Sequence, residues 1–242
     1  MAIVKNYLLG YKDMYIYQDN EMFNFSLDSV LLPNFVTINK KHKLILDIGC
    51  GNAPIPLILS TRTDAKIIGI EIQKESYELA IKSVNENNLQ KQIEIINADI
   101  NEWYKTIESD TFDVITCNPP YFKYTETSNL NANEYKTIAR HEVKLDIERL
   151  IKISKKLLKN KGILAIVHRP ERFLEIVEEM KKNNIMPKRV QFIYPATNKE
   201  ANIMLIEGIK NGNEGMKIMP PLFSHNDNGD YTEEIKQFFE KR

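Results

Sequence analysis

The chain has 242 residues, of which 43% are hydrophobic, so it is long enough to bury one sizeable core. Its 33 basic and 33 acidic side chains cancel, which argues against a protein coated uniformly with positive charge for nucleic-acid binding. No apolar run reaches the length of a membrane span, and no basic-then-apolar leader is present. We therefore expect a cytoplasmic protein without a membrane partner.

The charge is unevenly distributed along the chain. Residues 1–120 carry 11 basic and 16 acidic side chains, whereas residues 121–242 carry 22 basic and 17 acidic ones. The second half is thus the better candidate for a surface that contacts an anionic substrate. Its many Lys–Glu pairs on helical patterns are equally compatible with an ordinary solvated surface.

The first chemical signal is a glycine-containing turn that follows an apolar strand ending at Asp47. Gly49 and Gly51 permit a tight bend and close backbone approach, and Pro54 suits the first turn of the following helix. A dinucleotide fingerprint would require Gly or Ala at the position of Pro54. The pattern Asp-x-Gly-x-Gly-x-Ala is closer to the turn of S-adenosylmethionine enzymes, with Ala53 replacing its last glycine.

Two further strands of the pattern end in acidic residues. The run at 66–70 is followed by Glu71, where a carboxylate can accept hydrogen bonds from both ribose hydroxyls of a cofactor. The run at 93–98 is followed by Asp99, which is placed to accept from an adenine amine. Each acid alone is more typical of a solvated loop, but the ordered set favours a ligand site at the carboxyl edge of a parallel sheet.

The strongest functional signal is Asn118-Pro119-Pro120-Tyr121, which follows the strand at 112–117. Two prolines make a stiff turn whose carbonyls remain open to donors, and Asn118 adds a side-chain acceptor beside them. Such acceptors can grip the N–H bonds of a planar amine or amide and orient its lone pair toward an electrophile. Tyr121 supplies a ring that can hold the planar group. A simple Pro-Pro turn closing a buried strand is the alternative interpretation.

The remaining elements alternate between helical and strand patterns. Helices are predicted at 73–87, 146–159 and 171–183, and strands at 162–167, 189–194 and 202–207. This alternation predicts an α/β fold with parallel strands and crossover helices, whereas the short connection at 195–201 predicts an antiparallel hairpin. We expect a single domain with an N-terminal cap at 1–40, a catalytic core at 41–210 and a C-terminal extension at 211–242.

Cations gather after the motif turn and after the strand that ends near His168. The polar segment at 122–137 has no clear period and is predicted to be a loop beside the reactive centre, a common place for substrate contacts. The candidate substrate-binding residues are Lys123, Arg140, His141, His168, Arg169 and Arg172. The scattered histidines and the two cysteines, Cys50 and Cys117, form no metal-binding pattern, so we expect buried thiols and no metal.

Beyond these motifs, several blocks of the chain carry a family resemblance. The blocks are residues 25–32, 47–53, 118–121, 140–142, 168–172, 200–202 and 207–210. Together they resemble the bacterial tRNA adenosine N6-methyltransferases that modify the adenosine immediately 3′ of the anticodon in a valine tRNA. The glycine turn and the Asn-Pro-Pro-Tyr turn are shared with many amino-methyltransferases, whereas the flanking blocks favour this family.

The resemblance implies a fold, a cofactor and a partner. The fold is a Rossmann-like class I methyltransferase with seven strands in the order 3-2-1-4-5-7-6, strand seven antiparallel and helices on both faces. The methyl donor is S-adenosylmethionine, which leaves as S-adenosylhomocysteine, and the partner is tRNA. The segment around Asp28 would cap the cofactor pocket. The cofactor-binding residues are then expected to be Asp28, Asp47, Gly49, Cys50, Gly51, Ala53, Glu71, Ile72, Asp99, Ile100 and Asn118.

The expected mechanism is direct transfer of the methyl group to adenine N6. Asn118 and a carbonyl of Pro119 or Pro120 accept hydrogen bonds from the amine, and Tyr121 stacks on the flipped-out base. A base in a single-stranded loop flips out at a lower energetic cost than a paired one. A protein-glutamine N5-methyltransferase could use the same turn on a side-chain amide. An inactive cofactor- or RNA-binding module is the third alternative. The sequence does not determine which tRNA or which nucleotide is modified. It does not determine the oligomeric state either, although we favour a monomer.

Overall fold

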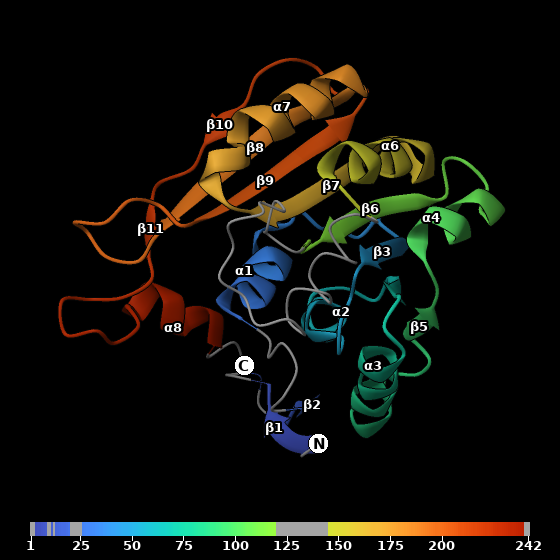
Figure 1. The fold of residues 1–242 in the computed structure, drawn as a ribbon, viewed down its shortest axis with the longest axis horizontal. Helices are drawn as coiled ribbons and strands as arrows, with labels where there is room; N and C mark the ends of the chain where they lie inside the picture. Colours follow the sequence, from blue (N-terminus) through green and yellow to red (C-terminus); the bar gives the residue numbers. More distant parts are fainter. Residues whose placement is uncertain (1–2, 9–10, 12, 20–25, 120–144, 240–242) are drawn as a thin grey trace, which may run out of the picture.

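The computed structural model of this chain describes all residues except 1–2, 9–10, 12, 20–25, 120–144 and 240–242 (Figure 1). The strands are β1 (Ile3–Tyr7), β2 (Tyr15–Asp19), β3 (Leu44–Ile48), β4 (Lys66–Glu71), β5 (Ile93–Asn97), β6 (Phe112–Cys117), β7 (Leu158–His168), β8 (Ile185–Tyr194), β9 (Ile203–Lys210), β10 (Lys217–Ile218) and β11 (Leu222–Phe223). The helices are α1 (Leu27–Phe35), α2 (Pro54–Ser60), α3 (Lys74–Glu86), α4 (Ile100–Trp103), α6 (Ile147–Leu157), α7 (Phe173–Lys182) and α8 (Glu233–Phe239), with short 3-10 turns η1 (Tyr104–Thr106) and η2 (Pro170–Arg172).

One large sheet organises the molecule. Its strand order is β10-β8-β9-β7-β6-β3-β4-β5, and β11 also pairs with β8. Strands β3 to β7 run parallel, and β9 is antiparallel to both of its neighbours, β7 and β8. Counted without the two short additions, this order is the predicted 3-2-1-4-5-7-6. The predicted count of seven strands was too low, because β10 and β11 extend the β8 edge to nine strands.

Helices cover both faces of this sheet, so the core has two layers of side chains. On one face, α1, α2, α3 and α8 pack on residues such as Ile45, Ile67 and Val114. On the other face, α4, α6 and α7 pack on Leu46 and Ile115, among others. Figure 1 shows these two groups of helices on opposite sides of the strands. Alternate residues of a strand point to opposite faces, which explains how each strand feeds both layers.

Two strand boundaries differ from the predicted ones for local reasons. Strand β8 begins at Ile185 instead of 189 and passes a register shift between Pro187 and Arg189, a bulge that absorbs a proline without a backbone donor. Strand β7 begins at Leu158 and includes Lys161, whose φ of 66° is a left-handed conformation that the sequence pattern reads as a loop. The predicted helix at 146–159 therefore ends earlier, at residue 157.

Helix α1 is tied to the sheet by a buried ion pair. The Glu207 carboxylate of β9 is 6% exposed and accepts hydrogen bonds from the Thr37 backbone nitrogen at 2.9 Å and the Thr37 hydroxyl at 2.7 Å. Arg189 Nε lies 3.2 Å from Glu207, and its guanidinium lies 4.3 Å from the Phe35 ring centroid. Because the described partners of this carboxylate are Thr37, just after α1, and Arg189 of β8, the carboxylate fixes the carboxyl end of α1 over the sheet.

A second, two-stranded sheet stands apart from the large one. It consists of β1 and β2, which pair antiparallel from Ile3 opposite Asp19 to Tyr7 opposite Tyr15. Figure 1 shows this hairpin beside α3. In the part of the chain that the structure describes, no helix combines the length and the apolar character needed to cross a bilayer.

Candidate active site at the carboxyl edge of the sheet

The predicted site residues follow strands that end in register. Ile48 of β3 lies opposite Ile70 of β4 and Cys117 of β6, and Ile70 lies opposite Ile96 of β5. The residues that come next along each strand therefore share one edge of the sheet. These residues are Gly49, Glu71, Asn97 and Asn118. The structure thus brings the glycine turn, the first acid and the motif asparagine to the same edge, as parallel strands require.

The glycine turn adopts left-handed backbone at three of its residues. Gly49 has φ of 70°, Gly51 has φ of 56° and Ala53 has φ of 73°. Ala53 therefore takes the conformation that glycine holds at this position in the related turn, at a steric cost of about 1 kcal/mol. A Cβ built on Gly49 or Gly51 meets no atom of the described residues within 4 Å. With respect to these residues the space above the turn is open, and the glycines serve the backbone conformation rather than packing.

The Glu71 carboxylate holds this turn in place. One oxygen accepts from the Gly51 backbone nitrogen at 2.9 Å, and the other accepts from the Gln73 backbone nitrogen at 2.7 Å. Burial raises the pKa of Glu71, and these backbone donors oppose the rise. Each carboxylate oxygen has a second lone pair, so Glu71 can still accept two hydroxyl donors from a ligand.

Asp47 sits beneath the turn with no exposed surface. Its Oδ1 accepts from the Thr116 hydroxyl at 2.6 Å, whereas Oδ2 has no hydrogen-bond partner among the described residues. Burial raises the pKa of Asp47 to about 8, and the hydrogen bond from Thr116 opposes the rise only in part. Asp47 is therefore largely protonated at neutral pH, and because it is fully covered, a ligand above the turn could affect it only through its neighbours or its electric field.

The end of β5 supplies the second predicted acid. Asp99 begins α4, and its Oδ1 accepts from the backbone nitrogen of Asn101 at 2.9 Å and from the Asn101 side-chain amide at 3.1 Å. Asn97 donates its amide to the Glu71 carbonyl at 2.8 Å and to the Ile72 carbonyl at 3.2 Å. This amide joins the carboxyl ends of β4 and β5. Ile100 is buried directly behind Asp99.

The motif asparagine meets helix α1 across the edge. Asn118 Nδ2 lies 3.3 Å from Ser29 Oγ, and both Ser29 and its neighbour Asp28 are 6% exposed. Helix α1 also packs against α2, the helix that follows the glycine turn. The first turn of α1, which contains Asp28, therefore lies close to the predicted reacting group. Pro119 is buried, and Asn118 is partly exposed.

The sequence predicts that His168, Arg169 and Arg172 are three potential cations at the exit of β7, and the structure shows how each is surrounded. His168 is 1% exposed, and burial lowers its pKa to about 4, so its imidazole is neutral at pH 7. Arg172 donates through Nη2 to Glu175 at 2.5 Å, and its side chain is 14% exposed. Arg169 donates to the Asn202 carbonyl at 2.7 Å. The three residues lie at the predicted edge, but their polar groups are engaged within the protein.

Five of the predicted site residues lie outside the described residues. They are Pro120, Tyr121, Lys123, Arg140 and His141. Cys50 and Cys117 are free thiols and buried, as predicted. The Cys50 side chain is turned away from solvent, so only its backbone is placed for a ligand above the turn. No group of three or more possible metal ligands occurs within the described ranges.

Sequence reasoning missed four polar residues of this edge. They are Ser29, Asn97, Asn101 and Thr116. Asn97 and Asn101 flank Asp99 at two positions on either side, so an amide-acid-amide spacing was a usable signal. Thr116 lies inside an apolar strand, where a lone hydroxyl marks a buried polar partner. Ser29 lies in the block at 25–32 that carries the family resemblance, but its contact with Asn118 depends on the packing of α1, which the sequence does not show.

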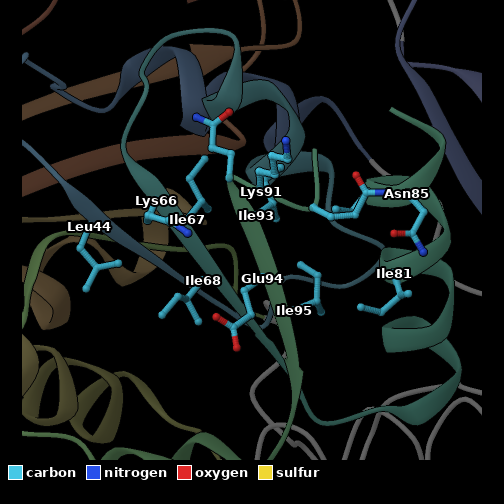
Figure 2. Close-up of a pocket in the computed structure, with 13 residues that line it drawn as sticks. Leu44, Lys66, Ile67, Ile68, Ile81, Asn85, Lys91, Ile93, Glu94 and Ile95 are labelled. Carbon is cyan, nitrogen blue, oxygen red and sulfur yellow. The ribbon is translucent and has the colours of Figure 1, made fainter. Parts of the chain in front are cut away.

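A surface hollow lies at the other end of the strands (Figure 2). It is lined by the amino-terminal halves of β4 and β5 and by α3, with Lys66, Ile68, Ile81 and Glu94 among its residues. None of the predicted site residues lines it. The geometry of the carboxyl edge, with its open left-handed turn and paired acids, is the better candidate for chemistry.

The chain is similar to known methyltransferases over most of its length. A family model described as a methyltransferase domain matches residues 39–237. The chain is 31% identical over 188 residues to the tRNA1(Val) (adenine(37)-N6)-methyltransferase of Flavobacterium psychrophilum, which covers 76% of this chain and 79% of that protein. A protein of the same description from Christiangramia forsetii is 25% identical over 236 residues, with 97% of this chain and 96% of that protein covered.

A solved structure supports the same fold. The predicted O-methyltransferase of Agrobacterium tumefaciens superposes with a TM-score of 0.68 at 20% identity and covers 88% of this chain and 95% of its own. At that identity the likeness concerns the fold alone. It agrees with the mostly parallel sheet that helices cover on both faces.

The buried carboxyl of Asp47 predicts an unusual pH dependence of stability. Its pKa is raised from 3.8 to about 8 on folding, so the folded state binds more protons between these values and loses stability as the pH rises through them. Asp47→Asn removes this titration and keeps an acceptor for Thr116. The free energy of unfolding of the variant, minus that of the parent, should therefore increase from pH 5 to pH 8. The increase should be at most about 1.4 kcal/mol per pH unit.

Urea unfolding at pH 5, 6, 7, 8 and 9 measures this difference. Glu94→Gln, a change at an exposed acid of β5, is the matched control and should show no such trend. A constant difference between Asp47→Asn and the parent over the whole range would mean that Asp47 is ionised in the folded protein at neutral pH.

Proposed function

Because the chain belongs to the tRNA1(Val) (adenine(37)-N6)-methyltransferase family, we propose that it methylates N6 of an adenosine in the anticodon loop of a tRNA, with S-adenosylmethionine as donor. The observation that carries the proposal is the placement of Asn118 and Pro119 at the carboxyl end of β6, directly beside the open glycine turn of β3. A methyl donor above that turn and a planar amine at Asn118 would share one edge of the sheet.

The residues of the carboxyl edge fit the proposed donor. The open space above Gly49 and Gly51 admits a ligand against the backbone, and Glu71 retains lone pairs for the ribose hydroxyls. Asp99 is the proposed acceptor for the adenine amine, with the Ile100 backbone beside it. The proposed N-terminal cap is residues 1–40, and its helix α1 would cover the cofactor pocket near Asp28. The pocket itself belongs to the proposed catalytic core at 41–210. Cys50, Ala53 and Ile72 would contribute backbone contacts.

The proposed chemistry follows from what Asn118 and its turn can accept. The donor supplies a methyl group bonded to a positively charged sulfur. Asn118 Oδ1 accepts a hydrogen bond from one N6–H group of the adenine, and a carbonyl of the Pro119–Pro120 turn accepts one from the other. These two hydrogen bonds direct the nitrogen lone pair away from both acceptors. The new carbon–nitrogen bond forms as the carbon–sulfur bond breaks, and the electron pair of that bond stays on sulfur.

The same acceptors stabilise the charge that develops on nitrogen. As the bond forms, N6 becomes positive and its N–H bonds become better donors, so hydrogen bonds to Asn118 and the proline carbonyl strengthen in the transition state. The amine becomes acidic only after methylation and then releases one proton to water. No strong base is required at Asn118. Tyr121 is the proposed stacking surface for the adenine ring.

A protein-glutamine N5-methyltransferase remains the second candidate. The same turn can grip a carboxamide, and the hydrogen bonds of Arg169 to the Asn202 carbonyl and of Arg172 to Glu175 compete with contacts to an RNA. The family assignment and the nucleic-acid substrate of its relatives outweigh this observation. Lys123, Arg140 and His141 are the remaining proposed substrate cations.

The product of the reaction tests the proposal directly. When the protein is incubated with unmodified total tRNA and S-adenosylmethionine, digestion and mass spectrometry should reveal new N6-methyladenosine. A heat-inactivated sample is the control. If tRNA stays unlabelled while a glutamine-bearing protein substrate gains a methyl group, the second candidate is correct.

Removal of the motif amide should separate catalysis from donor binding. Asn118→Ala should lower the turnover number by about two orders of magnitude, because the lost acceptor acts mainly on charge that develops in the transition state. The dissociation constant of S-adenosylhomocysteine, measured by calorimetry, should change little. Equal losses in turnover and in cofactor affinity would show instead that Asn118 holds the cofactor.

A further inference from the structure

The outward face of the β1–β2 hairpin is an aromatic surface. Pairing places Lys5 opposite Tyr17 and Tyr7 opposite Tyr15, so these four side chains share one face of the two-stranded sheet. Tyr7 is 65% exposed, and Ile3 at the end of the same face is 54% exposed. Ile16 and Gln18, which alternate with Tyr15 and Tyr17, are buried against the protein. The hairpin thus hides one face and presents three tyrosines on the other.

Two lysines lie on the faces of these rings. Lys5 Nζ lies 3.8 Å from the centroid of Tyr15, and Lys82 Nζ of α3 lies 4.1 Å from the centroid of Tyr17. The rings of Tyr7 and Tyr15 are 4.9 Å apart. Lys5 also forms an ion pair with Glu86, whereas Lys82 forms no ion pair with any residue that the structure describes. Aromatic faces and ammonium groups are therefore interleaved on one exposed surface.

This surface is held rigidly and is connected to the proposed active site. The Tyr15 backbone donates to Asn87 Oδ1 at 2.9 Å and accepts from Asn87 Nδ2 at 2.7 Å, and the Tyr17 backbone donates to Ser83 Oγ at 2.9 Å. Side chains of α3 thus pair the free edge of β2. Asn52 of the glycine turn donates to the Tyr17 carbonyl at 2.8 Å. The hairpin is preorganised, and it shares a hydrogen bond with the turn at the carboxyl edge.

We propose that the hairpin face of Lys5, Tyr7, Tyr15, Tyr17 and Lys82 is a second contact surface for the RNA substrate, outside the catalytic edge. The proposal rests on the proposed function. An unpaired base stacks on Tyr7, and a neighbouring phosphate meets Lys82, while Lys5, paired with Glu86, supports the Tyr15 ring. Exposed aromatic rings on a sheet with cations beside them are the chemistry of single-stranded RNA recognition, since every base has a π face and every linkage a charge.

The ring and the charge predict different responses to substitution. Tyr7→Ala should weaken binding of unmodified tRNA by about 5- to 100-fold, the range for one lost base stack. Tyr7→Phe keeps the ring and should stay within about twofold of the parent. Lys82→Ala should reduce the slope of log affinity against log salt by about 0.7–0.9, as for one lost phosphate contact.

Fluorescence anisotropy with labelled tRNA at several salt concentrations measures these affinities. Tyr231→Ala, at a tyrosine of the C-terminal region that is 37% exposed, is the matched control and should bind like the parent. Calorimetry with S-adenosylhomocysteine and thermal unfolding should give parental values for all four variants. These two readouts separate RNA contact from damage to the fold.

Two outcomes overturn the proposed surface while leaving the proposed function intact. In the first, the parent methylates tRNA, and Tyr7→Ala and Lys82→Ala bind it with parental affinity at every salt concentration. In the second, tRNA affinity is unchanged and Tyr7→Ala abolishes self-association of the parent in sedimentation, which assigns the face to protein contact. A parent that never labels tRNA fails the proposed function itself.

A separate network fixes the orientation of Asp99. Arg149 Nε of α6 donates to Asn101 Oδ1 at 3.0 Å, and Asn101 in turn donates through its backbone and its amide to Asp99 Oδ1. A guanidinium has donors only, so the Asn101 amide oxygen must face Arg149 and its nitrogen must face Asp99. The Tyr104 ring lies 5.3 Å from the Arg149 guanidinium carbon and supports it from the side.

We infer that Asn101 and Arg149 are positioning residues that help Asp99 recognise the adenine of S-adenosylmethionine. This inference also rests on the proposed function. Both hydrogen bonds that Asp99 accepts from the described residues fall on Oδ1. Oδ2 is thereby reserved for the exocyclic amine of the adenine. A carboxylate without this support could turn, and its preference for a ligand that carries the amine would fall.

Paired ligands test the inference without a catalytic assay. The parent should bind S-adenosylhomocysteine about tenfold or more tightly than the analogue whose purine lacks the 6-amino group, as for a hydrogen bond to a charged group. Arg149→Ala and Asn101→Ala should reduce that ratio several-fold. Lys156→Ala removes another cation that contacts Tyr104, at 5.1 Å from its ring, and should leave the ratio unchanged.

An unchanged ratio in Arg149→Ala and Asn101→Ala would overturn the positioning role, even if both variants lost some stability. A loss of affinity for both ligands by the same factor would also overturn it, because a merely structural defect does not distinguish the two purines. A parent that binds neither ligand would instead contradict the proposed cofactor.

Discussion

The carboxylate of Glu71 is the constraint on which the carboxyl edge depends. The turn after β3 contains three left-handed residues, and neither glycine has a side chain that could anchor it. Its conformation is held by backbone bonds to the Ile70 carbonyl and by the bond from Gly51 to Glu71. Because the same carboxylate also accepts from Gln73, it joins the turn to the start of α3. Glu71, which is proposed to bind the ribose, thus also holds the glycine turn in place. Its replacement would therefore alter both cofactor binding and the conformation of the turn.

Most of the fold could be predicted from the sequence: the alternation of strands and helices predicts parallel strands with crossover helices, and the short connection at 195–201 predicts the antiparallel pair. The strand order came from the family resemblance. Boundaries were wrong at Pro187 and Lys161, where a bulge and a left-handed residue extend strands through positions that local patterns exclude. The β1–β2 hairpin was not predicted at all. Its strands are short, and the bonds that fix it come from Asn87 and Ser83, more than sixty residues away in the chain.

At the site, the sequence predicts which residues reach the edge but not their electrostatic state. Asp47, Glu71 and Asn118 follow from strand ends alone. That Asp47 is covered and protonated depends on packing from both neighbouring strands, and that His168 is neutral depends on burial beside Arg172. A charge is assigned from residue type in a sequence, whereas in the folded protein desolvation decides it. For this reason His168 is neutral at the exit of β7, whereas Arg169 and Arg172 keep their charge and form hydrogen bonds within the protein.

The neutral state of these buried groups bears on the kind of catalysis this edge can perform. Neither Asp47, which has no exposed surface, nor His168, which is 1% exposed and has a pKa of about 4, is placed to act as a general base on a bound substrate. The proposed reaction relies on Asn118 and on backbone carbonyls, which would stabilise the developing charge with fixed dipoles. Transfer to an amine tolerates this arrangement, because the nitrogen lone pair attacks before any proton leaves. A hydroxyl acceptor would need its proton removed first, and neither Asp47 nor His168 is placed to remove it.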